Sequence, residues 1–133
     1  MTLGDGGLEV AVLSYDAWVD RDCAVLMPYG DADAYAVPML RRALGEAIAM
    51  AKRPDLVVIC DSIEYIDSTG VGVLLSVFKR LRSRGGAIAL CGVSEQLSQT
   101  LRITGLAKTL PEFPTVEEAL DWLEQRTGPM RRR

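Results

Sequence analysis

Histidine is absent from this 133-residue sequence, and histidine is the side chain that most often moves protons near neutral pH. Its absence excludes a Ser-His-Asp triad and any histidine-ligated metal site. The sequence also lacks a GxxxxGK[ST] segment, which excludes a phosphate-binding loop of that type. These gaps predict that the chain is not an enzyme and that it has no metal ion or cofactor of its own.

Cysteine is scarce, and the three cysteines, Cys23, Cys60 and Cys91, are far apart in the sequence. No Cys-x-x-Cys pair occurs, which excludes the usual zinc and thioredoxin-like redox motifs. Each cysteine lies within or beside an apolar run. The sequence therefore predicts three small buried side chains in a reducing compartment.

Long hydrophobic runs and an excess of basic charge are missing as well. No apolar run approaches the roughly 20 residues of a membrane-spanning helix, and residues 1–10 lack the features of a signal peptide. Eighteen acidic and fifteen basic residues give a net charge of −3, which argues against direct binding to nucleic acid. We expect a cytoplasmic protein without a membrane span. The basic end, within 125–133, is expected to be a flexible tail.

The residues that are present predict one α/β domain. Hydrophobic residues make up 49% of the chain, enough for a core without disulfides. Short apolar runs predict strands, and 61–67 is expected to be a loop. The predicted strands cover residues 8–13, 23–27, 56–60, 87–91 and, at an edge, 109–113.

Helical patterns occupy the intervals between these strands. Leu40, Leu44 and Ile48 recur every fourth residue and define the buried face of the first helix. Asp33 or a residue shortly after it is expected to cap that helix, and the fourth is expected to run to about residue 126. Strands that alternate with helices predict a mixed, mostly parallel sheet with about four helices. The predicted helices start at or near four residues: Pro38, Ser68, Ser94 and Thr115.

Two short polar segments follow predicted strands, at 30–33 and at 67–70. The carboxyl ends of parallel strands meet at one edge of a sheet, where ligands of open α/β sheets bind. Ser68 would lie at a helix N-terminus, which favours an anion such as a phosphate ester. Gly70 and Gly72 would allow a neighbouring backbone to approach closely.

A purely structural interpretation of the same residues stays open. Asp-Ser-Thr at a helix start is ordinary capping sequence, and Asp33 can be a helix cap rather than a contact residue. Tyr29 and Tyr35 lie near the first turn, where each can contact a partner or cover the edge of the core.

Several segments along the chain, taken in order, resemble the STAS domain, which sulphate transporters and anti-sigma factor antagonists share. The resemblance covers residues 8–124 and is greatest to the free-standing bacterial antagonists. The segments that carry it are Gly30-Asp31-Ala32-Asp33, Pro38 with its Leu/Ala-rich helix, Leu56-Val57-Val58-Ile59, 65–75 (YIDSTGVGVLL), Arg84-Gly85-Gly86, Thr104-Gly105-Leu106 and 115–120 (TVEEAL).

The resemblance implies a single STAS-like α/β domain that regulates transcription by partner switching, as in stress responses. Ser68 would be phosphorylated by the anti-sigma factor, which is itself an ATP-binding serine kinase. The unphosphorylated chain would bind that kinase and so release the sigma factor, and a serine phosphatase would reset the switch. The oligomeric state does not follow from the resemblance.

The resemblance also implies a surface that binds the kinase. Asp33 and Asp67 match the acidic positions of that surface in the family. Thr69 is a second possible acceptor, but its β-branched side chain is expected to turn into the first helical turn, which favours Ser68. The implied partner-binding residues are Asp31, Asp33, Asp67, Ser68, Thr69, Gly70 and Val71.

Two alternatives remain at this point. The chain could be an unphosphorylated STAS scaffold subunit of a membrane transport complex, since the same helix-start motif occurs there. It could also be a scaffold in a stressosome-like particle.

Overall fold

The computed structural model describes the backbone of residues 14–131 and the side chains of residues 14–126. The strand predicted at 8–13 lies outside the described residues. Six strands and four helices alternate along the chain: β1 (Ser14–Asp20), β2 (Cys23–Ala32), α1 (Val37–Met50), β3 (Leu56–Ile59), β4 (Ile63–Ile66), α2 (Ser68–Arg82), β5 (Ile88–Cys91), α3 (Glu95–Ile103), β6 (Glu112–Phe113) and α4 (Val116–Arg131).

The sheet is mixed and mostly parallel, as the sequence predicts. Its strand order is β1-β2-β3-β5-β6, and β4 pairs with β2 off this path. Only the β1–β2 pair is antiparallel among the described strands. The all-apolar strands β3 and β5 are buried along their whole length, because helices cover both faces of the sheet at its centre.

A tight hairpin connects β2 to β1, a strand that the sequence pattern did not predict. Asp20 pairs with Cys23, so the turn consists of two residues. Arg21 and Asp22 both have positive φ, 52° and 63°. Two-residue turns with positive φ match the right-handed twist of the strands they join, which explains a close hairpin without glycine.

The prediction that 61–67 is a loop is wrong for its second half. Ile63–Ile66 forms β4, which pairs in parallel with the end of β2 through Gly30–Ile63 and Ala32–Ile66. The register shifts between Gly30 and Asp31, and Gly30 has a φ of 105°. This irregularity allows one long strand to pair first with β3 and then with β4. Of the polar segment 30–33, expected to follow a strand, residues 30–32 are therefore the last part of β2.

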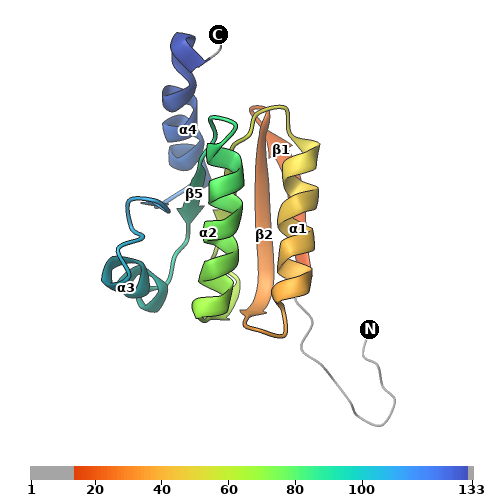
Figure 1. Ribbon diagram of the computed structural model, residues 1–133, viewed down its shortest axis with the longest axis vertical. Helices are drawn as coiled ribbons and strands as arrows, with labels where there is room; N and C mark the ends of the chain where they lie inside the picture. Colours follow the sequence, from red (N-terminus) through yellow and green to blue (C-terminus); the bar gives the residue numbers. More distant parts are fainter. Residues whose placement is uncertain (1–13, 132–133) are drawn as a thin grey trace.

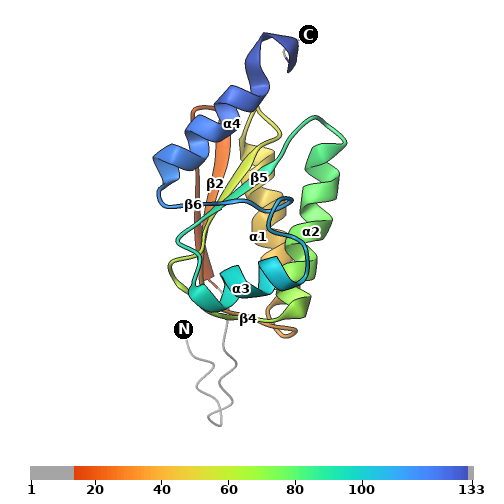
Figure 2. The same ribbon diagram turned by 90° about the vertical axis from the view of Figure 1, so that its left-hand side faces the viewer.

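Two helices cover one face of the sheet and one covers the other. In Figure 1, α1 and α2 run side by side in front of the sheet, and both begin at the same end of the molecule. Figure 2 shows α4 on the opposite face. The core under α1 and α2 includes Leu26, Leu44 and Leu90, whereas α4 buries Leu120 and Leu123 against Val57.

The three cysteines are buried and free, as predicted. They fall on both sides of the sheet. Cys60 faces the core under α1 and α2, and Cys23 and Cys91 face the core under α4. Side chains of successive strand residues alternate between faces, which explains why neighbouring strand ends carry thiols that point apart.

The observed helix starts agree with the predicted ones, whereas the observed end of the last helix differs from its predicted end. Ser94 is the N-cap of α3 and accepts a hydrogen bond from the Leu97 N–H at 3.1 Å, and Thr115 accepts one from the Glu118 N–H. The last helix, however, continues to Arg131 instead of ending near residue 126. The domain bounds of 8–124 and the flexibility of 125–133 stay predictions.

Candidate functional site

The site lies at the sheet edge where β2 and β4 end. Asp31 pairs with Tyr65 and Ala32 with Ile66 across the two parallel strands. The Asp67 N–H then donates to the Ala32 carbonyl oxygen at 3.3 Å. Two segments that lie more than thirty residues apart in the sequence therefore end side by side. Asp31 and Asp33 come to the same edge as the start of α2, as the sequence predicts.

Asp67 is the N-cap of α2. Its Oδ1 atom accepts hydrogen bonds from the backbone N–H groups of Thr69 at 3.0 Å and Gly70 at 3.2 Å. It also accepts one from the Thr69 hydroxyl. The hydrogen bond from Thr69 and those from the first-turn N–H groups stabilise the ionised form, and together they lower the pKa of Asp67 below its usual value. Asp67 is therefore a carboxylate at neutral pH.

The two hydroxyls that follow Asp67 differ in their environments. The Thr69 hydroxyl is occupied, because it donates to Asp67. Ser68 is exposed as the first residue of α2, and its hydroxyl forms no hydrogen bond within the described part of the chain. The exposed and unengaged hydroxyl of Ser68 is thus the one that an enzyme in solution can reach without breaking a native contact.

Gly70 and Val71 are part of the packing beneath the surface of the site and do not contribute to that surface. Both are buried. A β-carbon at Gly70 would stand 2.4 Å from the Ala32 carbonyl oxygen, so glycine is required where α2 crosses the end of β2. Gly72 is different: it is exposed, with nothing within 4 Å of a β-carbon. The expectation of a close approach is confirmed for Gly70 and wrong for Gly72.

Asp33 orders the chain between β2 and α1. Its Oδ1 atom accepts hydrogen bonds from the backbone N–H groups of Tyr35 at 3.1 Å and Ala36 at 3.2 Å. The N-cap of α1 is Ala36, which makes no side-chain cap, and Pro38 lies in the first turn. Asp33 therefore caps the turn that precedes the helix. Its carboxylate remains at the surface, half-buried like that of Asp31.

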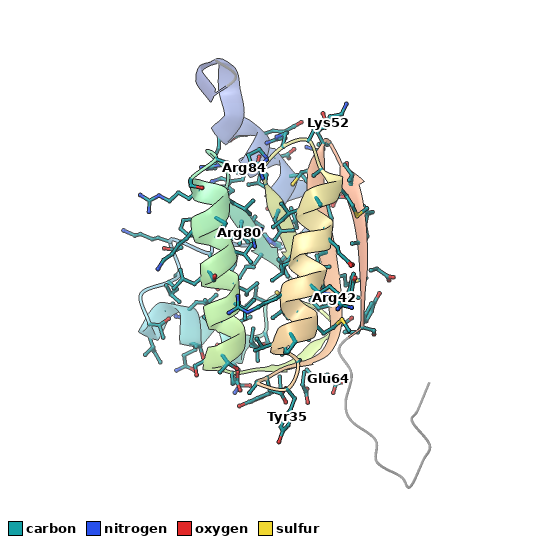
Figure 3. The ribbon with its side chains drawn as sticks, turned by 45° about the vertical axis from the view of Figure 1, so that its right-hand side comes forward. Tyr35, Arg42, Lys52, Glu64, Arg80 and Arg84 are labelled. Carbon is teal, nitrogen blue, oxygen red and sulfur yellow. The ribbon has the colours of Figure 1, made fainter. Side chains whose placement is uncertain are left out.

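The tyrosines of this region have separate roles. Tyr29 donates its hydroxyl to Asp16 across the β1–β2 hairpin, away from α2. Tyr35 is 86% exposed and does not cover the core. Figure 3 shows Tyr35 and Glu64 at the end of the molecule where α1 and α2 begin. Glu64 and Tyr65 are exposed on β4, a strand within the segment 61–67 that the sequence pattern predicted to be a loop.

The chemistry of this edge is that of a modification and contact surface. It offers a free serine hydroxyl at a helix N-terminus and several carboxylates. The described residues contain no group of three or more acidic, cysteine or histidine side chains placed to hold a metal ion. None of the helices between residues 14 and 131 combines the length and apolar composition needed to cross a membrane.

Comparisons of the sequence with protein families and with known proteins point to the same family. The STAS domain model matches residues 14–119, most of the chain. An anti-sigma F factor antagonist from Paenibacillus polymyxa is 30% identical over 104 residues, which cover 78% of this chain and 89% of the relative. An anti-sigma-B factor antagonist from Listeria monocytogenes is 35% identical over 98 residues, which cover 74% and 84%.

A solved structure extends the likeness to the fold. The Bacillus cell fate determinant SpoIIAA in its phosphorylated form superposes with a TM-score of 0.62 at 24% identity, covering 81% of this chain and 97% of that one. At this identity the likeness shows the shared architecture.

Proposed function

This chain belongs to the STAS domain family, and from that premise we propose that it is an anti-sigma factor antagonist switched by phosphorylation of Ser68. Unphosphorylated, it binds an anti-sigma factor and so frees the sigma factor. Phosphorylated, it does not bind. The observation that carries the proposal is the hydroxyl of Ser68, which is exposed and unengaged at the first position of α2.

The contact surface is the edge around that hydroxyl. It comprises the carboxylates of Asp31, Asp33 and Asp67, and Ser68 and Thr69 at the start of α2, while Gly70 and Val71 hold the helix against β2. Tyr35 adds an exposed aromatic ring next to this surface. Aromatic side chains are frequent anchors of protein interfaces.

The kinase supplies ATP and magnesium, because the chain offers an acceptor and no nucleotide loop.

Phosphorylation adds about −1.5 to −2 charges at neutral pH. The N-terminus of α2 accommodates that charge, so the fold is retained. The same charge opposes binding, because a dianion buried where the partner packs closely on the start of α2 must be desolvated. A serine phosphatase removes it. In this cycle the chain is a cytoplasmic substrate and binding partner, not an enzyme.

The test begins with the intact mass of the protein isolated from its host during growth and under stress. We expect one phosphate on the wild-type chain, none on Ser68→Ala and one on Thr69→Val. A soluble ATP-binding kinase should co-purify with the unmodified pool.

Binding of that kinase is then compared between Ser68→Asp and Gln125→Glu, which adds a charge on the exposed side of α4. We expect Ser68→Asp to weaken binding by at least tenfold and Gln125→Glu to leave it unchanged, with both variants folded by circular dichroism. Equal binding of Ser68→Asp and wild type contradicts the proposal. Absence of phosphate under every condition, with a membrane transporter or a large particle co-purifying, identifies a scaffold instead.

A further inference from the structure

One exposed face of α2 extends from Ser68 toward the C-terminal end of the helix. Ser68, Gly72, Ser76 and Lys79 follow one another at helical spacings of four, four and three residues, so they share a face. Ser68, Gly72 and Lys79 are exposed, and Ser76 is half-buried. Ser68 and Lys79 are about 16 Å apart along the axis, at a rise of 1.5 Å per residue.

The far end of this face is basic. Lys79, Arg80 and Arg82 lie in the last turn of α2 and Arg84 follows it, all exposed. None of the four forms an ion pair or donates a side-chain hydrogen bond within the described residues. They therefore remain available to a partner. We call these four residues the basic end of α2.

Exposed cations also lie on α1 and just beyond it, outside the basic end of α2. Arg41 and Arg42 on α1 and Lys52 just beyond it are exposed and form no ion pair with another described residue. Figure 3 shows Arg42, Lys52, Arg80 and Arg84 on the helical side of the molecule, with Arg84 and Lys52 at the end remote from Tyr35.

Acidic side chains do not neutralise this surface. Helix α2 contains no acidic residue, and α1 contains only Glu46, which accepts a hydrogen bond from Tyr15 on β1. Two cations elsewhere are paired with carboxylates: Arg21 with Asp121 and Glu124, and Arg53 with Asp55. Arg102 and Lys108, on α3 and after it, form no ion pair with a described residue. Unpaired positive charge is thus concentrated on the outer faces of α1 and α2 although the chain as a whole carries −3.

We propose that the basic end of α2 is a second docking region that binds an acidic patch on the same protein partner that contacts Ser68. This inference rests on the proposed function and adds the electrostatic polarity of the partner. The partner presents basic groups to Asp33 and Asp67 and acidic groups to Lys79 and Arg80, about 16 Å farther along α2.

Continuity and charge favour a protein over a polyanion. The strip from Ser68 to Lys79 runs along one helix face over exposed Gly72 and half-buried Ser76, and Gly72 leaves open space in which a partner surface can lie close to the helix. One interface of standard size, about 800 Å² on each partner, spans such a distance. A nucleic acid or an anionic membrane would meet Asp31, Asp33, Glu64 and Asp67 at the other end of the strip and be repelled there.

The two charged ends have a consequence for association. Complementary patches steer diffusional encounter and fix the orientation of the complex, and they act mainly on the association rate constant. The acidic end alone attracts a basic partner in many orientations. The basic end of α2 adds a second contact, which selects the single orientation in which the active site of the kinase meets Ser68.

The test compares two double charge reversals with the same change in net charge. Lys79→Glu with Arg80→Glu alters the basic end. Arg102→Glu with Lys108→Glu is the control, because these exposed cations lie on α3 and after it, outside the strip, and Arg102 also lies in a last helical turn. The probe is the serine kinase that co-purifies with the wild-type chain, and association is followed by stopped flow at several salt concentrations.

We expect the reversal at Lys79 and Arg80 to lower the association rate constant about tenfold at low salt and to flatten its salt dependence, with the control near wild type. Equal effects of the two reversals overturn the second docking region. The second docking region is also overturned if the reversal at Lys79 and Arg80 leaves kinase association unchanged but abolishes binding of a DNA duplex or of phosphatidylglycerol vesicles. Failure of Ser68→Asp to weaken the kinase complex overturns the proposed function itself, so the two failures are distinguishable.

Discussion

The carbonyl oxygen of Ala32 lies so close to Gly70 that a β-carbon on residue 70 would be only 2.4 Å from it. The side chain of Ile66 would be 2.8 Å away on another side. This contact fixes the start of α2 against the ends of β2 and β4. It therefore sets the position of Ser68 relative to Asp31 and Asp33.

Substitution of Gly70 tests this contact. Gly70→Ala is expected to cost about 1–3 kcal/mol of unfolding free energy, because a backbone carbonyl cannot move aside as a flexible side chain can. Gly72→Ala, two residues along the same helix, meets open space and is expected to stabilise by about 0.5–1 kcal/mol. Urea unfolding of the two variants measures both. Similar destabilisation by both would show that the close approach at Ala32 is not the reason for glycine.

Asp67 links stability to acid pH. Its folded-state pKa is lowered by the Thr69 hydroxyl and by the Gly70 and Thr69 N–H groups. A carboxyl whose folded pKa is depressed contributes stability above its unfolded pKa, near 3.8, and this contribution is lost as the pH falls through the folded value. Asp67→Ala should therefore be less stable than wild type at neutral pH, and the difference should shrink below pH 4.

Asp67→Asn separates charge from capping in that experiment. Asparagine is also a good N-cap, but it does not titrate. We expect this variant to retain much of the stability at neutral pH and to lack the acid-dependent loss at this site. Thermal unfolding from pH 2 to pH 7 gives the curves. Parallel curves for wild type and Asp67→Ala would disprove the linkage.

Asp55 holds the opposite end of the sheet together. Its carboxylate is fully buried, pairs with Arg53 at 2.7 Å and accepts a hydrogen bond from the Ala87 N–H at 3.1 Å. Removal of one partner of a buried pair leaves an uncompensated charge, so Asp55→Ala is expected to lose about 3–5 kcal/mol. Asp121→Ala breaks an exposed pair with Arg21 and should cost far less. Urea denaturation midpoints compare the two variants, and equal losses would contradict the role of burial.

The buried thiols predict slow cysteine chemistry. Desolvation by burial raises the pKa of Cys23 to about 12 and that of Cys91 to about 11, and it raises that of Cys60 as well. At pH 8 very little thiolate is present in the folded protein. Iodoacetamide should add almost no mass to the native chain and three labels after unfolding. Rapid labelling of the native protein would show that the thiols are accessible.

Oxidation offers a further check on the packing. Cys60 follows β3 and Cys91 ends β5, and both thiols lie near the Val58 carbonyl oxygen, at 3.7 and 3.9 Å. Their side chains nevertheless pack in the separate cores on the two faces of the sheet. We expect no disulfide between them when the native protein is treated with a mild oxidant, as seen by intact mass and non-reducing peptide mapping. A mass loss of two hydrogens in the folded monomer would contradict this arrangement.

The sequence by itself determined the local elements and the candidate acceptor. Period-four apolar residues predict α1, buried apolar runs predict β3 and β5, and Asp67 before Ser68-Thr69 predicts the start of α2. These signals are local, because capping and side-chain periodicity depend on residues within one or two turns. The absence of histidine likewise needs no structure.

Only the tertiary structure decided which of these residues lie together and which glycine is required. Strand β4 is short and half-exposed, and its pairing with β2 depends on a register shift at Gly30 that no local pattern encodes. The contact at Ala32 explains Gly70 but not Gly72. Such distinctions arise from contacts between segments far apart in the chain, and the free energy of those contacts exists only once the sheet has assembled.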